Sequence, residues 1–258
     1  MSGNQNDDAR VLFLADSHFH TERDAAEQRR LDAFLALLDR HAGIADVVLM
    51  GDIFDFWFDY PHFVMKGYEP LLRVLDRVRA AGSRVHFVGG NHDIWAARYL
   101  HDRYGSDPAG GPVTLELDGQ RVRCVHGDGL LGRDLFYAAF RSVVRHRAGV
   151  LLGKSLHPEL LYAFSNWLSG TSRGCTRDEI AGIERKAARW LERQRATDWD
   201  HLIMGHVHHQ FTVEHDGRRL TTLGGWLDPR QYAVWRGGAL ATCTDSGGPG
   251  GAVPGPTA

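Results

Sequence analysis

The chain has few cysteines, and none of them is closely paired along the sequence. Cys124, Cys175 and Cys243 lie far apart and form no CxxC motif. Disulfide frameworks and thiolate zinc sites normally show closely spaced cysteines. We therefore expect a protein of a reducing compartment.

Long hydrophobic runs are also absent. No apolar stretch approaches the ~18 residues of a transmembrane helix, and residues 1–10 lack the basic and apolar regions of a signal peptide. We expect a cytoplasmic protein whose contact with the inner membrane is at most peripheral. The formal net charge of -2 gives no overall attraction to nucleic acid, so no nucleic-acid partner is expected.

What the chain does have is ample apolar residues and many histidines. Of its 258 residues, 43% are hydrophobic, which is enough for the core of one catalytic domain. We expect a flexible N-terminus at residues 1–9, a domain at 10–243, and a disordered tail at 244–258, where Gly, Pro, Ser and Ala dominate. The fifteen histidines cluster with Asp, Asn and Gly.

Apolar runs and amphipathic segments alternate along the first third of the chain, which predicts an α/β fold. Helices are predicted at residues 25–39 and 68–81, and a mostly helical insertion at about 135–195. Strands are predicted at 11–15, 46–50, 84–88, 113–117, 121–125, 201–204, 212–215, 218–223 and 231–235. Parallel units followed by hairpins predict two mixed sheets that pack face to face, with helices outside.

Five polar clusters each follow a predicted strand. They are Asp16-Ser17-His18, Gly51-Asp52 with Asp55, Gly90-Asn91-His92-Asp93, His126-Gly127-Asp128, and Gly205-His206-Val207-His208. The carboxyl ends of strands line the ligand crevice of α/β sheets, so these loops can converge. Taken singly, each residue is better explained as a turn residue, a helix cap or a structural histidine than as a ligand. Their joint occurrence favours a metal site.

The donor types are carboxylate, amide oxygen and imidazole. This mixture suits Mn²⁺, Fe²⁺, Zn²⁺ or Ni²⁺ better than Ca²⁺. A carboxylate shared by two cations holds them ~3.5–4 Å apart, and Asp52 is the candidate for that bridge. Alternate residues just past a strand can point the same way, so Asp16 and His18 can both reach one cation. The predicted ligands are Asp16, His18, Asp52, Asn91, His126, His206 and His208.

The five motifs resemble those of the calcineurin-like metallophosphoesterase superfamily, whose pattern is D-x-H, GDxxD, GNHD or GNHE, a lone His, and GHxH. The resemblance implies a four-layer α/β/β/α sandwich and two divalent metal ions, with Mn²⁺ the first candidate. It implies that His208 joins Asp16, His18 and Asp52 at one metal, and that Asn91, His126 and His206 join Asp52 at the other. His92 would contact the phosphate or protonate the leaving oxygen, and Asp93 would orient its imidazole.

Longer segments resemble the family of UDP-2,3-diacylglucosamine diphosphatases. They are residues 51–60 (GDIFDFWFDY), 85–95 (VHFVGGNHDIW), 126–130 (HGDGL) and 156–158 (LHP). That resemblance implies cleavage of a UDP-linked acylated sugar to UMP and 2,3-diacylglucosamine 1-phosphate, in lipid A synthesis. The best-known branch has Arg at the position of His92, so the chain is similar to a His-containing sister branch.

The apolar segment 135–168 carries Arg141, Arg145, Arg147 and Lys154. It can be a lid that holds acyl chains and approaches anionic headgroups, or an ordinary helical pair packed on the core. The segment has more apolar residues than the buried face of one helix needs, which favours the lid.

Four residues near the insertion are predicted to bind substrate. Asp134 lies where the family has an acidic residue that contacts the glucosamine, although it can also be a helix cap. Arg133 beside it can meet phosphate. Arg173 and Arg177 can approach the diphosphate, or they belong to a solvated loop.

Two other functions remain open. A phosphoesterase acting on another nucleotide, phosphodiester or phosphoprotein would use the same metal site, but an apolar lid favours a lipid-linked substrate. A scaffold that has lost catalysis would keep the fold alone. Retention of His92 beside every metal-type residue argues against a scaffold.

Overall fold

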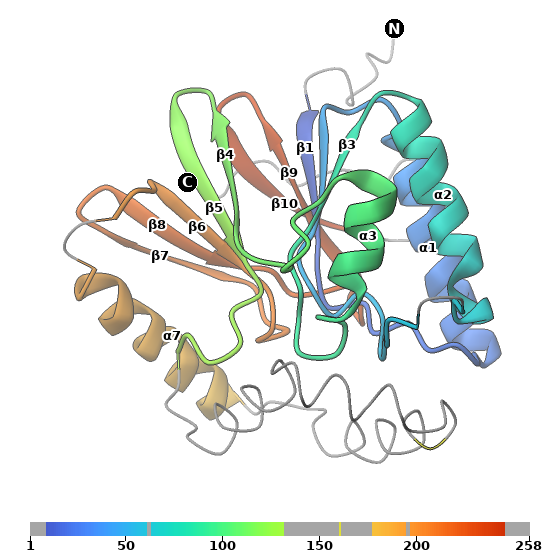
Figure 1. The fold of residues 1–258 in the computed structure, drawn as a ribbon. Coiled ribbons are helices and arrows are strands. Elements are labelled where there is room, and N and C mark those ends of the chain that lie inside the picture. The colour runs from blue at the N-terminus through green and yellow to red at the C-terminus, as the bar shows by residue number, and fades with distance from the viewer. Residues whose placement is uncertain (1–8, 61–62, 132–159, 161–176, 195–196, 246–258) are drawn as a thin grey trace, which may run out of the picture.

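Two β-sheets form the centre of the molecule, and helices cover their outer faces (Figure 1). The computed structural model describes residues 9–60, 63–131, 160, 177–194 and 197–245. The first sheet has the order β10-β9-β1-β2-β3, in which β1, β2 and β3 are parallel. Its strands are β1 (Ala9–Leu14), β2 (Asp46–Leu49), β3 (Arg84–Phe87), β9 (Gln231–Arg236) and β10 (Ala239–Thr244).

The second sheet has the order β4-β5-β6-β8-β7, and its central strands β5, β6 and β8 are parallel. The strands are β4 (Val113–Leu117), β5 (Gln120–Val125), β6 (His201–Met204), β7 (Phe211–His215) and β8 (Arg218–Thr222). Hairpins join β4 to β5 and β7 to β8, as the sequence predicted.

Helices pack on both outer faces. The helices α1 (Ala25–Arg40), α2 (Glu69–Ala80) and α3 (Ala96–Tyr104) lie on the first sheet, and a 3-10 turn, η1 (Lys66–Tyr68), precedes α2. The helix α7 (Arg177–Glu192) packs against β7 and β8 of the second sheet. Among the described helices, none is long and apolar enough to cross a membrane.

Alternate residues of β1 show why the layers stack in this order. Leu12 and Leu14 are buried in the core between the first sheet and α1–α3. Val11 and Phe13 point to the other face and are buried between the two sheets. A third core, which includes Leu191 and Leu220, lies under α7. Because both faces of β1 are apolar, the strand must be covered on both sides. The predicted four-layer α/β/β/α sandwich is confirmed.

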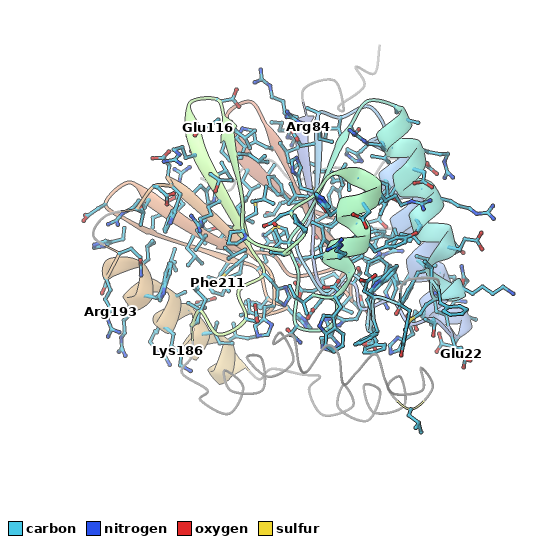
Figure 2. All side chains as sticks on the ribbon, viewed as in Figure 1. Glu22, Arg84, Glu116, Lys186, Arg193 and Phe211 are labelled. Carbon is cyan, nitrogen blue, oxygen red and sulfur yellow. The ribbon has the colours of Figure 1, made fainter. Side chains whose placement is uncertain are left out.

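Exposed charged residues lie at some of the strand ends that face away from the candidate ligands. Arg84 at the start of β3 and Glu116 near the end of β4 both lie there (Figure 2). Arg84 forms two hydrogen bonds of 2.7 Å with Asp46, the first residue of the neighbouring strand β2.

Several predicted boundaries need correction. The strand β1 begins at Ala9, inside the segment that composition assigned to a flexible N-terminus, and Thr244 pairs with Gln231 rather than starting a tail. The helix α3 and the strand β10 were not predicted, because α3 has nine residues and β10 consists mainly of small residues. Most of the predicted insertion at 135–195 lies outside the described residues, and α7 is its described end.

Candidate metal centre

The five polar clusters meet at the carboxyl ends of β1, β2, β3, β5 and β6. The first two loops are joined by their backbones: the Asp16 N–H donates to the Gly51 carbonyl at 3.1 Å, and the His18 N–H donates to the Asp52 carbonyl at 2.8 Å. The fifth loop joins them because the His206 N–H lies 2.9 Å from a carboxylate oxygen of Asp16. Asp16 and His206, 190 positions apart, therefore share one site.

One group of donors consists of Asp16, His18 and His208. The Nε2 atoms of the two histidines lie 3.2 Å apart, and His208 Nε2 lies 3.4 Å from Asp16 Oδ1. One donor atom from each residue falls within 4.8 Å of the others, a spacing that can hold a metal ion.

A second group consists of Asp52, His126 and His206. His126 Nε2 lies 3.3 Å from Asp52 Oδ2 and 3.3 Å from His206 Nδ1. The amide oxygen of Asn91 joins this group, at 3.1 Å from His126 Nε2. Asp52 Oδ2 also lies 3.8 Å from His18 Nε2, so this carboxylate stands between the two groups.

The chemistry of these donors fits divalent cations. The Nδ1 of His126 lies 3.0 Å from the Met50 carbonyl, which leaves Nε2, inside the group, as the nitrogen that a cation would bind. Glycines leave the room that this packing needs. A Cβ on Gly90 would lie 2.1 Å from Asp52 Oδ1, and one on Gly205 would lie 2.5 Å from Asp16 Oδ2.

The backbone at these donors adopts a rare conformation. Seven described residues other than glycine have positive φ angles, and five of them are candidate ligands: Asp16, His18, Asp52, His206 and His208. Left-handed backbone is costly for residues with a Cβ atom and persists where the surrounding structure enforces it. Such outliers concentrate at functional sites.

Comparison with known proteins gives a consistent result. A family model described as calcineurin-like phosphoesterase matches residues 9–210.

The chain belongs to the calcineurin-like phosphoesterase family.

Three curated relatives of this phosphoesterase are named UDP-2,3-diacylglucosamine hydrolase. The protein from Porphyromonas gingivalis is 30% identical over 257 residues, which cover 90% of this chain and 96% of the relative. The protein from Pseudomonas putida is 26% identical and covers 87% and 93% of the two chains. The protein from Chromohalobacter salexigens is 27% identical, with 87% and 92% covered. Members of the family are metal-dependent hydrolases, and this phosphoesterase is an enzyme of that class.

Several ionisable donor residues of the metal centre are largely buried, and their pKa values are shifted. Burial by itself would raise the pKa of Asp52, but the adjacent His126 outweighs it and holds that pKa well below the ordinary value. Burial likewise opposes protonation of His126, yet the charge of Asp52 raises its pKa to about 10. Burial lowers the pKa of His18 to about 4. A buried carboxylate that stays ionised requires positive partners, which a divalent cation also provides.

His92 lies beside the first group without belonging to either. Its ring centroid is 4.7 Å from that of His18, and its Nδ1 lies 2.8 Å from the Asp55 carbonyl. Its backbone N–H donates to Asp52 Oδ1 at 2.9 Å. A carbonyl partner assigns the proton to Nδ1, which leaves Nε2 as the nitrogen for other partners.

The expected role of Asp93 is wrong, because its carboxylate does not hold the His92 imidazole. One oxygen accepts from the backbone N–H groups of Gly90 and Asp52 at 2.9 and 3.1 Å. The other accepts from Ile53 and Phe54 at 2.7 and 3.2 Å. Asp93 is fully buried, and burial with the nearby charge of Asp52 raises its pKa to about 6. It therefore shapes the loop that carries Asp52.

Two further features were not predicted from sequence. Asp55 is surrounded by imidazoles, with His20 Nε2 at 3.3 Å and His18 Nδ1 at 3.9 Å. The Gly225-Trp226 turn covers Asp16: the Trp226 N–H lies 3.2 Å from the Asp16 carbonyl, and a Cβ on Gly225 would lie 2.9 Å from Asp16 Cβ. The D-x-H-x-H spacing and the Gly-Gly-Trp triplet after a predicted strand were the available signals.

The side chains of the four residues predicted to contact substrate lie outside the described part of the structure. Arg133, Asp134 and Arg173 lie outside the described residues, and Arg177 begins α7 with a side chain that is likewise outside them.

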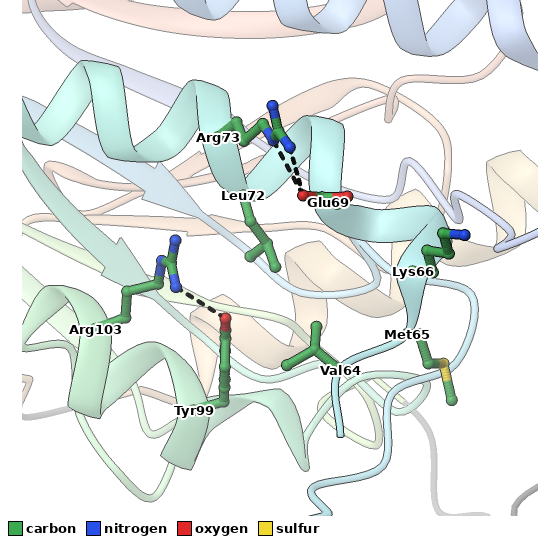
Figure 3. Close-up of a pocket in the computed structure, with 8 residues that line it drawn as sticks. All are labelled: Val64, Met65, Lys66, Glu69, Leu72, Arg73, Tyr99 and Arg103. Carbon is green, nitrogen blue, oxygen red and sulfur yellow. Dashed lines mark hydrogen bonds and ion pairs between the residues drawn. The ribbon is translucent and has the colours of Figure 1, made fainter. Parts of the chain in front are cut away.

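One described pocket lies apart from the metal centre, where η1 and the start of α2 face α3 (Figure 3). Its volume is about 410 Å³. The lining residues are Val64, Met65, Lys66, Glu69, Leu72, Arg73, Tyr99 and Arg103, none of which is a candidate ligand. Its arginines are paired, Arg73 with Glu69 at 2.6 Å and Arg103 with Tyr99 at 3.1 Å. The pocket is therefore separate from the chemistry.

Proposed function

We propose that this phosphoesterase cleaves the pyrophosphate bond of UDP-2,3-diacylglucosamine, giving UMP and 2,3-diacylglucosamine 1-phosphate in lipid A synthesis. The observation that carries the proposal is the pair of donor groups with Asp52 between them. The substrate rests on similarity to UDP-2,3-diacylglucosamine hydrolases over 90% of this chain.

Asp16, His18, Asp52 and His208 would hold one divalent cation. Asn91, His126 and His206, again with Asp52, would hold the second. Mn²⁺ is our first candidate, and Fe²⁺, Zn²⁺ and Ni²⁺ suit the same donors. When bound, such cations neutralise phosphate charge and supply an acidified water.

The protein side chains then have distinct tasks. His92, held through Nδ1 by the Asp55 carbonyl, presents Nε2 for a phosphoryl oxygen or for the oxygen of the leaving group. Asp93 accepts from four backbone N–H groups, three of which belong to the Asp52 loop and keep it in place. The Gly90 N–H is one of those four, so the loops that carry Asp52 and His92 share one anchor.

The remaining substrate contacts follow from the sequence. Asp134 would bind the glucosamine, and Arg133, Arg173 and Arg177 would bind the diphosphate. Because the substrate carries two acyl chains, the enzyme would work at the cytoplasmic face of the inner membrane, in peripheral contact with it.

The direct test measures UMP release from UDP-2,3-diacylglucosamine with added Mn²⁺, beside hydrolysis of a generic aryl phosphodiester. We expect UMP release by the wild type and losses of orders of magnitude in Asp52→Ala and His92→Ala, with metal content reduced only in Asp52→Ala. His215→Ala, at the end of the edge strand β7 and outside the candidate site, is the control and should behave as wild type. Strong diester hydrolysis without UMP release would instead indicate another phosphoester substrate.

A further inference from the structure

The loop that carries Asp16 and His18 is strained at both donor residues. Their φ angles are 49° and 44°, both in the left-handed region that residues with a Cβ atom rarely adopt. Ser17 lies between them and is fully buried. Two such residues separated by one position need contacts from outside the loop to stay in place.

Arg30 supplies contacts of this kind from the helix α1. Its Nη1 donates both to the Ser17 carbonyl and, at 3.0 Å, to the Trp226 carbonyl. The guanidinium carbon lies 4.8 Å from the centroid of the Phe19 ring. Arg30 therefore contacts Ser17 in the middle of the strained loop, Phe19 just after His18, and Trp226 in the turn that covers Asp16.

The contacts around Arg30 close into a ring. The Trp226 indole N–H donates to the Arg30 carbonyl at 3.0 Å, and the Trp226 backbone N–H lies 3.1 and 3.2 Å from the carbonyls of Ala15 and Asp16. The turn at Trp226 and the start of the Asp16 loop are thus both joined to α1. Moving Arg30 would release the loop on two sides.

Glu27, one turn earlier on α1, fixes the other end of the loop. Its Oε1 accepts from the His20 backbone N–H at 2.7 Å, and it lies 3.1 Å from His20 Nδ1 and 3.4 Å from Arg30 Nη2. Asp24 caps the helix by accepting from the Glu27 N–H at 2.7 Å. The first turns of α1 therefore form a rigid support, and Arg30 is its contact with Ser17.

The geometry of arginine is needed here. One guanidinium nitrogen donates to two carbonyls, and a second nitrogen faces Glu27. The planar guanidinium fixes the directions of its N–H groups relative to one another. A lysine would keep the charge but would bring a single nitrogen to this position. None of the atoms of Arg30 is a metal donor.

We infer that Arg30 is a positioning residue that sets the metal affinity of the Asp16, His18 and His208 group. The inference rests on the proposed metal centre but not on the proposed substrate. Removing a side chain that orients metal ligands typically lowers metal affinity by about 10- to 100-fold. The Asp52, His126 and His206 group also has supports of its own, at Met50 and Asp93, so its affinity should fall less.

The test titrates Mn²⁺ into metal-free wild type, Arg30→Gln, Arg30→Lys and Arg29→Gln, and measures each Kd by calorimetry. Arg29 is the matched control, because it is the exposed neighbour on the same helix. We expect two sites in wild type and in Arg29→Gln. In Arg30→Gln one site should weaken by about 10-fold or more, and Arg30→Lys should recover only part of that loss.

Amide hydrogen exchange of the metal-free proteins gives a second readout. Exchange at residues 15–19 and at Trp226 should accelerate in Arg30→Gln, while exchange at Ile53 and Phe54, which Asp93 holds, should not change. Unchanged Kd values for both sites in Arg30→Gln, equal weakening of both sites, or fewer than two sites in wild type would each overturn the inference. The titration uses no substrate. Failure of UMP release in the separate assay would therefore contradict the proposed substrate without affecting the measured Kd values.

Discussion

Left-handed residues occur at both ends of the two sheets, but for different reasons. At one end, Asp118 and Asp216 have φ angles of 50° and 47°, and each precedes a glycine in a two-residue hairpin. Asp-Gly is a preferred pair for such turns, so local sequence explains the conformation. At the other end, candidate ligands such as Asp16, Asp52 and His206 adopt it without a glycine after them. There, contacts with other loops must hold the backbone.

This difference separates local from long-range determinants of structure. Each left-handed residue at the metal centre costs about 1–3 kcal/mol unless it is compensated. Carboxylate and guanidinium groups that bind backbone atoms, above all Asp93 and Arg30, lie where that compensation is needed. Changes at the metal centre should therefore affect activity and stability far more than equivalent changes at the hairpins.

The largest expected effect comes from a single methyl group. In Gly90→Ala the new Cβ would lie 2.1 Å from Asp52 Oδ1 and 2.5 Å from the Asp52 nitrogen, so the candidate bridging carboxylate must move. We expect UMP release to fall by about 100-fold or more, since misplacement by an ångström has effects of that size.

Gly119→Ala is the matched change at a hairpin. No atom lies within 4 Å of its new Cβ, although the φ angle of 80° makes alanine unfavourable there. The free energy of unfolding should fall by about 1 kcal/mol, while kcat/KM stays at the wild-type value. Equal losses of activity in the two variants would remove the distinction between the two ends.

The next effect concerns two aspartates that both bind backbone N–H groups. Asp93→Ala leaves four buried N–H groups without their acceptor, and we expect a loss of about 3–5 kcal/mol in unfolding free energy. Asp107→Ala removes acceptors from Ala109 and Gly111 on an exposed turn, where water can replace them, so about 1 kcal/mol is expected. Urea denaturation measures both, and a smaller loss for Asp93→Ala would be inconsistent with its proposed role.

A buried histidine near the hairpin end predicts a pH effect. His201 begins β6, lies 2.9 Å from Thr221 Oγ1, and has its pKa lowered to about 4 by burial and by Arg219. The unfolded chain takes up a proton below pH 6.5 while the folded protein stays neutral until about pH 4, so stability falls as the pH falls through this range.

Between pH 8 and pH 5 His201 should lower the unfolding free energy by about 2 kcal/mol. His201→Gln should lack that component in urea denaturation at the two pH values. An identical pH dependence in wild type and variant would show that the His201 imidazole is not held neutral.

The smallest effect is expected in a hairpin turn. Asp216→Asn keeps a residue that tolerates left-handed backbone before Gly217, and it removes only exposed ion pairs with His215 and Arg218. The midpoint of urea unfolding should correspond to a change below about 0.5 kcal/mol. A loss several times larger would mean that the hairpins also depend on long-range contacts.

The sequence predicted the parts of this molecule that local patterns determine. Apolar runs revealed β1, β2 and β6, and the donor residues stood out because each cluster directly follows a strand. The role of Asp93 was not predictable, because its partners Asp52, Ile53 and Phe54 lie about 40 residues earlier in the chain.

The same reason explains why Arg30 was missed. On a helical wheel it is one more charged residue of α1, and its function arises from contacts with Ser17 and Trp226, the latter 196 positions away. The short helix α3 was missed because it starts three residues after Asp93, where the motif indicated a loop.

Mn²⁺ titration followed by electron paramagnetic resonance tests the central claim, that donors from five loops form one two-metal centre around Asp52, most directly. In the wild type, the second equivalent of Mn²⁺ should produce the signal of an exchange-coupled pair, as expected for ions ~3.5–4 Å apart. Asp52→Ala should show no coupled pair. Two uncoupled ions in the wild type, or a coupled pair that survives in Asp52→Ala, would contradict the claim.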